Sequence, residues 1–196
     1  MYATETAREV EKNYIDTGLV KFVYWDLPLG SHGYPAVVSA EASHCAGEQD
    51  AYWEMHDALF GEWKMLSELD PEDEAAAVEA VLPIGEPLVE DGQAFQACVE
   101  TQKYRPVVAT MLRQAMDMEI NATPAFLFGT VSPSGEQHVE PVMGYVEYEE
   151  FAKMLDREIS RAQGTPIPDP TEVPTPDADA ADDGGAAADD SGDGEG

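Results

Sequence analysis

The stretch Leu19–Trp25 constrains the fold most, because it is almost continuously apolar and rich in β-branched and aromatic residues. Such a run predicts a strand that is buried on both faces. An amphipathic helix comes before it, with apolar residues at spacings of four, three and four. These residues are Ala3, Ala7, Val10 and Tyr14. Gly18 is suited to the left-handed conformation that ends a helix, and it separates the two elements.

A buried strand that is entered from a helix is typical of a parallel sheet with crossover connections. Such a crossover needs a parent strand before the helix, and only two residues precede Ala3. We therefore expect the opening element of the fold to lie upstream of Met1. A sheet whose strand order does not need that element is the alternative.

The rest of the chain predicts a block of helices, then a β-hairpin and a last helix. The helix starts are marked by Pro35, by Asp70-Pro71-Glu72, by Asp91 and by Pro106. An apolar stripe follows the last of these starts, and its methionines are expected to fill the core. The stripe comprises Val107, Val108, Met111, Leu112, Ala115 and Met116. Strands are predicted at Ala125–Phe128 and His138–Met143, with a turn at Pro133–Gly135 between them, and the final helix should close near Gly164.

The charge of the chain limits its partners and its environment. Forty acidic residues against ten Lys and Arg give a formal charge of −30, which excludes nucleic acid because phosphate neutralisation needs clustered cations. At molar salt the Debye length falls to roughly 3 Å and the self-repulsion is screened. The composition therefore indicates a salt-adapted, haloarchaeal-type protein.

Residues 165–196 differ in composition from the rest of the chain. They hold ten of the forty acidic residues, no basic residue, and little that is large and apolar. They predict a disordered tail rich in Pro, Asp, Ala and Gly, with an acidic partner-binding tail or a surface spacer as the alternative. The remaining thirty acids against ten bases make residues 1–164 acidic as well.

The signals for localisation oppose one another. No apolar run approaches the roughly 18 residues that cross a bilayer, and the N-terminus lacks the basic and apolar regions of a signal peptide. The chain as written is therefore expected to be cytoplasmic. However, a disulfide between its two cysteines, Cys45 and Cys98, would suit an oxidising compartment.

Five segments, in order, resemble the DsbA-like thiol-disulfide oxidoreductases over roughly residues 2 to 162. They are Tyr14–Val23, Asp26–Leu29, Cys45–Gln49 with Tyr52–Phe60, Phe95–Cys98 and Ala122–Phe126. The resemblance implies an α/β, thioredoxin-like fold, truncated at its N-terminus, that forms one domain over residues 1–164. An all-helical insertion at about 35–118 would separate its βα and ββα parts.

In that family a Cys-x-x-Cys redox pair heads the helix that corresponds to Tyr2–Ile15, where the helix N-terminus stabilises the thiolate. This chain has no such pair, so the resemblance implies catalytic cysteines just upstream of Met1 and no activity in the chain alone. A natural remnant that lacks the chemistry is the alternative. Thr123-Pro124 resembles the family's cis-proline loop, where the backbone before the proline pairs with an extended substrate peptide.

Neither Cys45 nor Cys98 has the spacing of a redox pair, and the resemblance suggests instead an accessory structural disulfide. Two buried reduced thiols are an alternative. A third interpretation is a nucleophilic Cys45 that is activated by His44. Adjacent side chains on a helix point roughly 100° apart, which argues against this interpretation. The histidines show no helical i, i+4 pair and no Cys-x-x-Cys partner, so no metal site is expected. They are His32, His44, His56 and His138.

The resemblance therefore implies a protein thiol-disulfide oxidoreductase that needs no cofactor and works through a mixed disulfide held against Thr123 and Pro124. Its partners would be protein thiols and disulfides and a membrane redox partner. The protein is expected to be a monomer, on the exported or cell-surface side if a longer form exists. A non-catalytic peptide-binding or chaperone module is one alternative, and a glutathione-dependent kappa-class transferase or isomerase is another.

Overall fold

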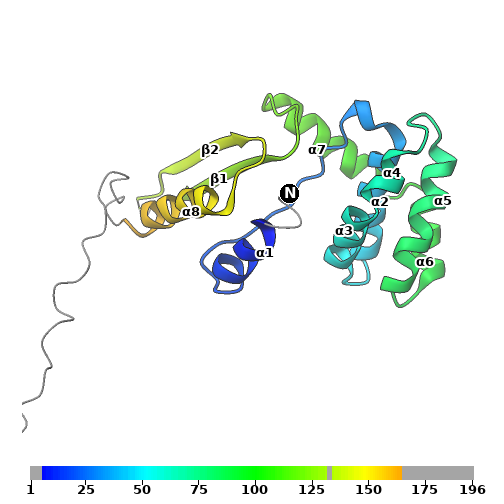
Figure 1. Cartoon of the computed structure of the whole chain (residues 1–196), viewed down its shortest axis with the longest axis horizontal. Coiled ribbons are helices and arrows are strands. Elements are labelled where there is room, and N and C mark those ends of the chain that lie inside the picture. The colour runs from blue at the N-terminus through cyan, green and yellow to red at the C-terminus, as the bar shows by residue number, and fades with distance from the viewer. Residues whose placement is uncertain (1–5, 132–133, 165–196) are drawn as a thin grey trace, which may run out of the picture.

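The computed structural model describes residues 6–131 and 134–164, whose elements form two groups (Figure 1). A β-hairpin with helix α8 beside it forms one group, helices α2 to α6 form the other, and α7 lies between them. The predicted helix start at Ala3, Pro133 of the predicted turn and the acidic tail at 165–196 lie outside the described residues. Within the described ranges, no helix is both long and apolar enough to cross a membrane.

The hairpin confirms the predicted strand pair. Strands β1 (Ala125–Val131) and β2 (Gln137–Met143) pair antiparallel. The register places Ala125 opposite Met143 and Thr130 opposite His138. Side chains alternate between the two faces, so His138, Glu140 and Val142 share one face of β2.

Helix α8 (Tyr148–Gln163) covers that face of the hairpin (Figure 1). The Phe151 ring lies 4.9 Å from the Phe126 ring and 4.8 Å from the Phe128 ring, measured between centroids. Helix α1 (Thr6–Val10) continues into a π-helical turn at Glu11–Ile15 and joins the same core. The buried residues of this core are Val10, Tyr14, Phe128, Phe151 and Leu155. Helix α8 ends at Gly164, as predicted, and this glycine has the left-handed conformation.

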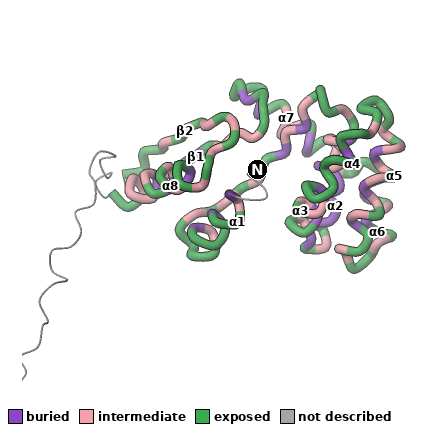
Figure 2. The backbone as a smooth tube through the Cα atoms, in the orientation of Figure 1, coloured by how far each residue is buried: buried purple, intermediate pink, exposed green. Residues whose placement is uncertain are grey.

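The helical block has a core of its own, and Figure 2 shows buried residues along α2. Its helices are α2 (Gly33–Gly47), α3 (Tyr52–Gly61), α4 (Trp63–Ser67), α5 (Glu74–Gly85) and α6 (Gly92–Glu100). Short 3-10 turns occur at Gly30–His32 and Glu86–Leu88. Side chains exposed by 1% or less fill this core, among them Val38, Ala42, Cys45, Ala46, Met55, Ala77, Val81, Phe95 and Val99.

One predicted helix start is confirmed and another is wrong by three residues. The Asp91 carboxylate accepts a hydrogen bond from the Ala94 amide and caps α6 as expected. Helix α5, however, is capped by Asp73, whose carboxylate accepts from the Ala76 amide. Asp70 instead accepts from the Glu72 amide two residues on, which is a local turn.

The prediction of a buried strand at Leu19–Trp25 is wrong for this structure. The segment has no regular secondary structure, and Val23 is 62% exposed. A strand exists only as part of a hydrogen-bonded ladder. In the part of the chain that the structure describes, β1 and β2 pair only with each other, so this segment has no ladder to join.

Helix α7 (Arg105–Asp117) begins one residue before the predicted start at Pro106, and its apolar stripe is only partly buried. Val108 and Ala115 are in the interior, whereas Met116 is 43% exposed. The expectation that the methionines fill the core is therefore wrong for Met116. The indole Nε1 of Trp25 donates a 3.0 Å hydrogen bond to the Met111 carbonyl and ties the irregular segment to this helix.

Candidate functional site

The loop before β1 contains the residues to which the DsbA-like resemblance gives a substrate-binding role. The Thr123–Pro124 peptide bond is cis, as the resemblance implied. The Pro124 carbonyl accepts a 2.8 Å hydrogen bond from the Gly144 amide, which ties the loop to the end of β2. Ile120, at the start of the loop, is buried, whereas Thr123 is exposed. The loop is thus anchored on both sides of an accessible Thr123.

The start of α1 meets the same end of the hairpin. The Thr6 hydroxyl donates a 3.3 Å hydrogen bond to the carbonyl of Val146, two residues after Gly144. Thr6 is 2% exposed, and its hydrogen bond to Val146 is partly buried. The segment 144–146 therefore touches both the proline loop and the first residue of α1. Two segments far apart in the sequence are brought to one end of the hairpin.

A carboxylate–imidazole pair lies where the irregular segment meets the helical block. His44 Nε2 lies 2.7 Å from Asp26 Oδ2, and Asp26 is 5% exposed. The His44 ring stacks on Tyr104 with 5.1 Å between centroids. Burial, and secondly the Asp26 carboxylate, raise the pKa of Tyr24 to about 12. This cluster fastens the segment to α2.

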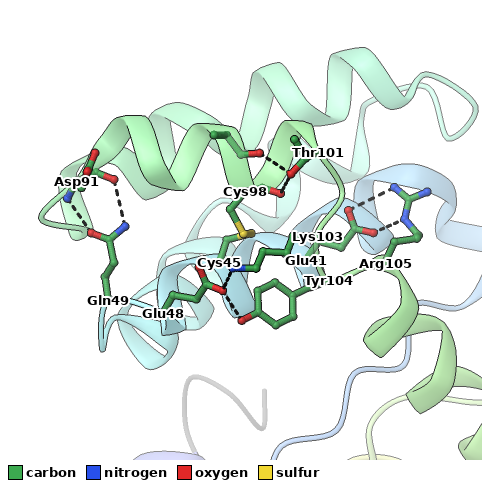
Figure 3. The surroundings of a disulfide bond; sticks show 11 residues. Glu41, Cys45, Glu48, Gln49, Asp91, Cys98, Thr101, Lys103, Tyr104 and Arg105 are labelled. Carbon is green, nitrogen blue, oxygen red and sulfur yellow. Dashed lines mark hydrogen bonds and ion pairs between the residues drawn. A yellow bond between two sulfur atoms is a disulfide. The ribbon is translucent and has the colours of Figure 1, made fainter.

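Cys45 and Cys98 form a disulfide that joins α2 to α6 (Figure 3). They are 1% and 6% exposed and lie in the core of the helical block. Both alternatives, reduced thiols and a Cys45 nucleophile beside His44, are therefore wrong in this structure. The chain has two cysteines in all, and both are in this bond.

Polar contacts hold the same region on either side of the disulfide (Figure 3). The Gln49 side chain donates to the Asp91 carbonyl at 3.1 Å and accepts from the Asp91 amide at 2.7 Å. On the other side, Lys103 and Tyr104 donate to the Glu48 carboxylate, and they lower its pKa. The disulfide thus belongs to a rigid junction rather than to an accessible reactive site.

The four histidines occupy unlike positions. His32 is exposed, His44 pairs with Asp26, and His56 Nδ1 lies 2.9 Å from the Asp57 carboxylate. His138 Nδ1 lies 3.0 Å from Glu158 Oε2 and has Glu140 beside it. The sequence patterns for metal sites, which are helical histidine pairs and cysteine spacings, do not reveal this last cluster. An alternating His-x-Glu on a predicted strand was the signal that could have suggested it.

The comparisons with known proteins agree with this architecture. A model of a family described as thioredoxin matches residues 2–156. The chain belongs to this thioredoxin family. A thioredoxin-like domain, built here from helices and a small two-stranded sheet, is the fold that the sequence predicted.

Curated relatives match the chain over only part of their own length. The Na⁺/H⁺ antiporter NhaA 3 of Salinispora tropica and the Na⁺/H⁺ antiporter NhaA 1 of Salinispora arenicola are each 28% identical to it over 146 residues. This region is 74% of the thioredoxin-like chain and 21% of each antiporter. No solved structure matches the chain.

Proposed function

We propose that this thioredoxin-like chain is the scaffold and peptide-binding part of a DsbA-like protein thiol-disulfide oxidoreductase. The domain spans residues 1–164, with its helical insertion at about 35–118. The observation that carries the proposal is the exposed Thr123 in a loop that lies at the same end of the hairpin as the start of α1.

A substrate peptide would lie extended along Thr123 and pair with its backbone, as peptides do when they add to the edge of a strand. This placement would hold a substrate sulfur beside the start of α1. In thiol-disulfide exchange, a thiolate attacks one sulfur of a disulfide and forms a mixed disulfide, and the other sulfur leaves as a thiolate. The second cysteine of the pair then attacks the mixed disulfide and releases the reduced substrate.

This reaction requires a redox pair that Cys45 and Cys98 do not supply, because both are buried in their own bond. The proposal therefore expects that pair just upstream of Met1, as the DsbA-like resemblance implies. Because Cys45 and Cys98 supply no redox pair, the chain also supports a second candidate function, which is a non-catalytic module that binds peptides. The antiporter relatives add no transport function to the proposal, because the match covers only a fifth of their length.

An insulin-reduction assay with dithiothreitol tests the proposal. The chain as given should be inactive, and the same chain with the residues encoded directly upstream of Met1 should accelerate insulin precipitation. A matched extension with both upstream cysteines replaced by serine should lose the acceleration. An extended chain that carries no cysteine pair, or one that carries the pair and remains redox-inert, would overturn the oxidoreductase and leave the peptide-binding module.

A further inference from the structure

Two adjoining hollows lie between Trp25 and helix α7, and together they form a groove on the helix that leads into the proline loop (Figure 1). The first hollow, of about 370 Å³, is lined by Trp25, Pro106, Val107, Thr110, Met111 and Gln114. The second hollow, of about 320 Å³, shares Trp25 and Gln114 with the first and adds Asp117 and Met118. The groove therefore passes from a mainly apolar end to an end with a carboxylate.

The indole of Trp25 forms the common wall of both hollows. Its Nε1 donates a 3.0 Å hydrogen bond to the Met111 carbonyl, and the residue remains 44% exposed. Within the described ranges, no other aromatic ring contacts this indole and no cation lies over it. The face of a tryptophan ring is electron-rich and attracts cations. The groove thus has an anchored aromatic wall with capacity for a cationic ligand.

The Asp117 carboxylate lies on the wall of the second hollow, at the C-terminal end of α7. Arg113 precedes it by one turn, but the Arg113 guanidinium donates to the Thr110 hydroxyl at 3.2 Å. Among residues 6–131 and 134–164, none makes a hydrogen bond or an ion pair with the side chain of Asp117 or Gln114. The carboxylate and the amide are therefore both available to a ligand in the hollow.

We propose that this end of the groove binds an arginine side chain of the substrate peptide, an inference that rests on the proposed peptide-binding function. A planar guanidinium would stack on the Trp25 indole and form a bidentate ion pair with the Asp117 carboxylate. The negative end of the α7 dipole adds to this attraction. The apolar end, at Val107 and Met111, would take an apolar side chain of the same peptide. An acidic side chain would be repelled by Asp117.

The groove lies within reach of a peptide bound at Thr123. Met118 is five residues before Thr123, so their α-carbons are at most about 18 Å apart. The chain also turns at Glu119, where φ is 60°, and the Ile120 amide donates to the Ala115 carbonyl, which brings the two ends closer. An extended peptide covers such a span in about six residues. The preferred substrates would be unfolded segments with an arginine within about six residues of the reacting cysteine.

The test is an NMR titration of the full chain with three capped peptides, at a salt concentration at which circular dichroism shows the chain folded. The peptides share the sequence Gly-Ser-Ala-Ser-Leu-Xaa-Ser-Gly-Ser, where Xaa is arginine, its neutral analogue citrulline, or glutamate. The Trp25 indole N–H and the Thr123 amide report binding, and Trp25→Phe assigns the indole signal. The arginine peptide should bind about three- to tenfold more tightly than the citrulline peptide. The glutamate peptide should bind most weakly.

Asp117→Asn should remove most of the preference for arginine and leave the affinity for the citrulline peptide unchanged. Asp16→Asn is the matched control, since it removes the same charge at an exposed position outside the groove, and it should keep the preference. Equal loss in the two variants would overturn the subsite, because the attraction would then belong to the negative charge of the whole chain.

The two reporter signals separate this inference from the proposed function. If the arginine and citrulline peptides shift the Thr123 amide with equal affinity, the arginine subsite is overturned and peptide binding at the loop stands. A shift at the Trp25 indole without one at Thr123 would overturn the assignment of the groove to the substrate peptide. If no peptide shifts either signal, both the subsite and the proposed peptide binding are overturned.

Discussion

The ring of Phe95 packs directly against the α-carbon of Gly85, so that a Cβ at residue 85 would lie 2.2 Å from Cζ of Phe95. Phe95 is fully buried in α6, and Gly85 is the last residue of α5. The close approach of α5 to α6 therefore requires a residue without a side chain at this position. Phe95 cannot retreat, because the core around it is closely packed.

We predict that Gly85→Ala destabilises the protein by about 1–3 kcal/mol through overpacking. Gly61→Ala is the matched control, since nothing lies within 4 Å of a Cβ at the end of α3. This control should be neutral or should stabilise by up to about 1 kcal/mol. Urea unfolding measures both changes, and equal effects of the two substitutions would contradict the packing argument.

The disulfide should contribute substantially to stability. Cys45 and Cys98 are 53 residues apart, and closing such a loop stabilises the fold by about 4 kcal/mol in the chain-entropy model. The double variant Cys45→Ala with Cys98→Ala should lose about this amount or slightly more, because small cavities also form. In a second measurement, the unaltered chain unfolded with a reductant present should show a midpoint close to that of the double variant. A loss below about 1 kcal/mol would contradict the prediction.

Tyr24 should make the protein less stable at high pH. Its pKa is about 12 in the fold because of burial and then of Asp26, against about 10 in the unfolded chain. The folded state therefore holds the proton more tightly. The stabilisation is complete below pH 10 and is lost as the pH rises toward 12. Urea unfolding at pH 9 and at pH 11 should show a smaller decline for Tyr24→Phe than for the unaltered chain. Equal declines would contradict a raised pKa at Tyr24.

Local signals predicted the elements that depend on neighbouring residues. Asp91 caps α6 through a hydrogen bond to an amide three residues on, and Gly164 ends α8 through its own backbone conformation. The hairpin likewise needs only two adjacent strands. Asp70, followed by Pro71 and Glu72, fits the cap pattern, yet its carboxylate closes a local turn and Asp73 caps α5.

Features that depend on distant residues could not be predicted. The apolar run Leu19–Trp25 indicates a strand only if a neighbouring strand is present, and the sequence pattern cannot supply that neighbour. The cluster of His138 with Glu158 joins residues 20 positions apart on a strand and a helix, so no spacing rule brings them together. The position of the proline loop was predicted from a resemblance, whereas its contact with segment 144–146 required the fold.

Salt should stabilise the protein, because forty acidic residues repel one another in the compact state. Raising KCl from 0.1 M to 2 M shortens the Debye length to roughly 3 Å or less, so the melting temperature should rise by about 5 °C or more. Deleting residues 165–196 removes ten acids but leaves thirty against ten bases. Most of the salt effect should therefore persist in the shortened chain, which also tests whether residues 1–164 fold alone. If the effect disappeared with residues 165–196, the repulsion would belong to that segment and not to the surface of the folded domain.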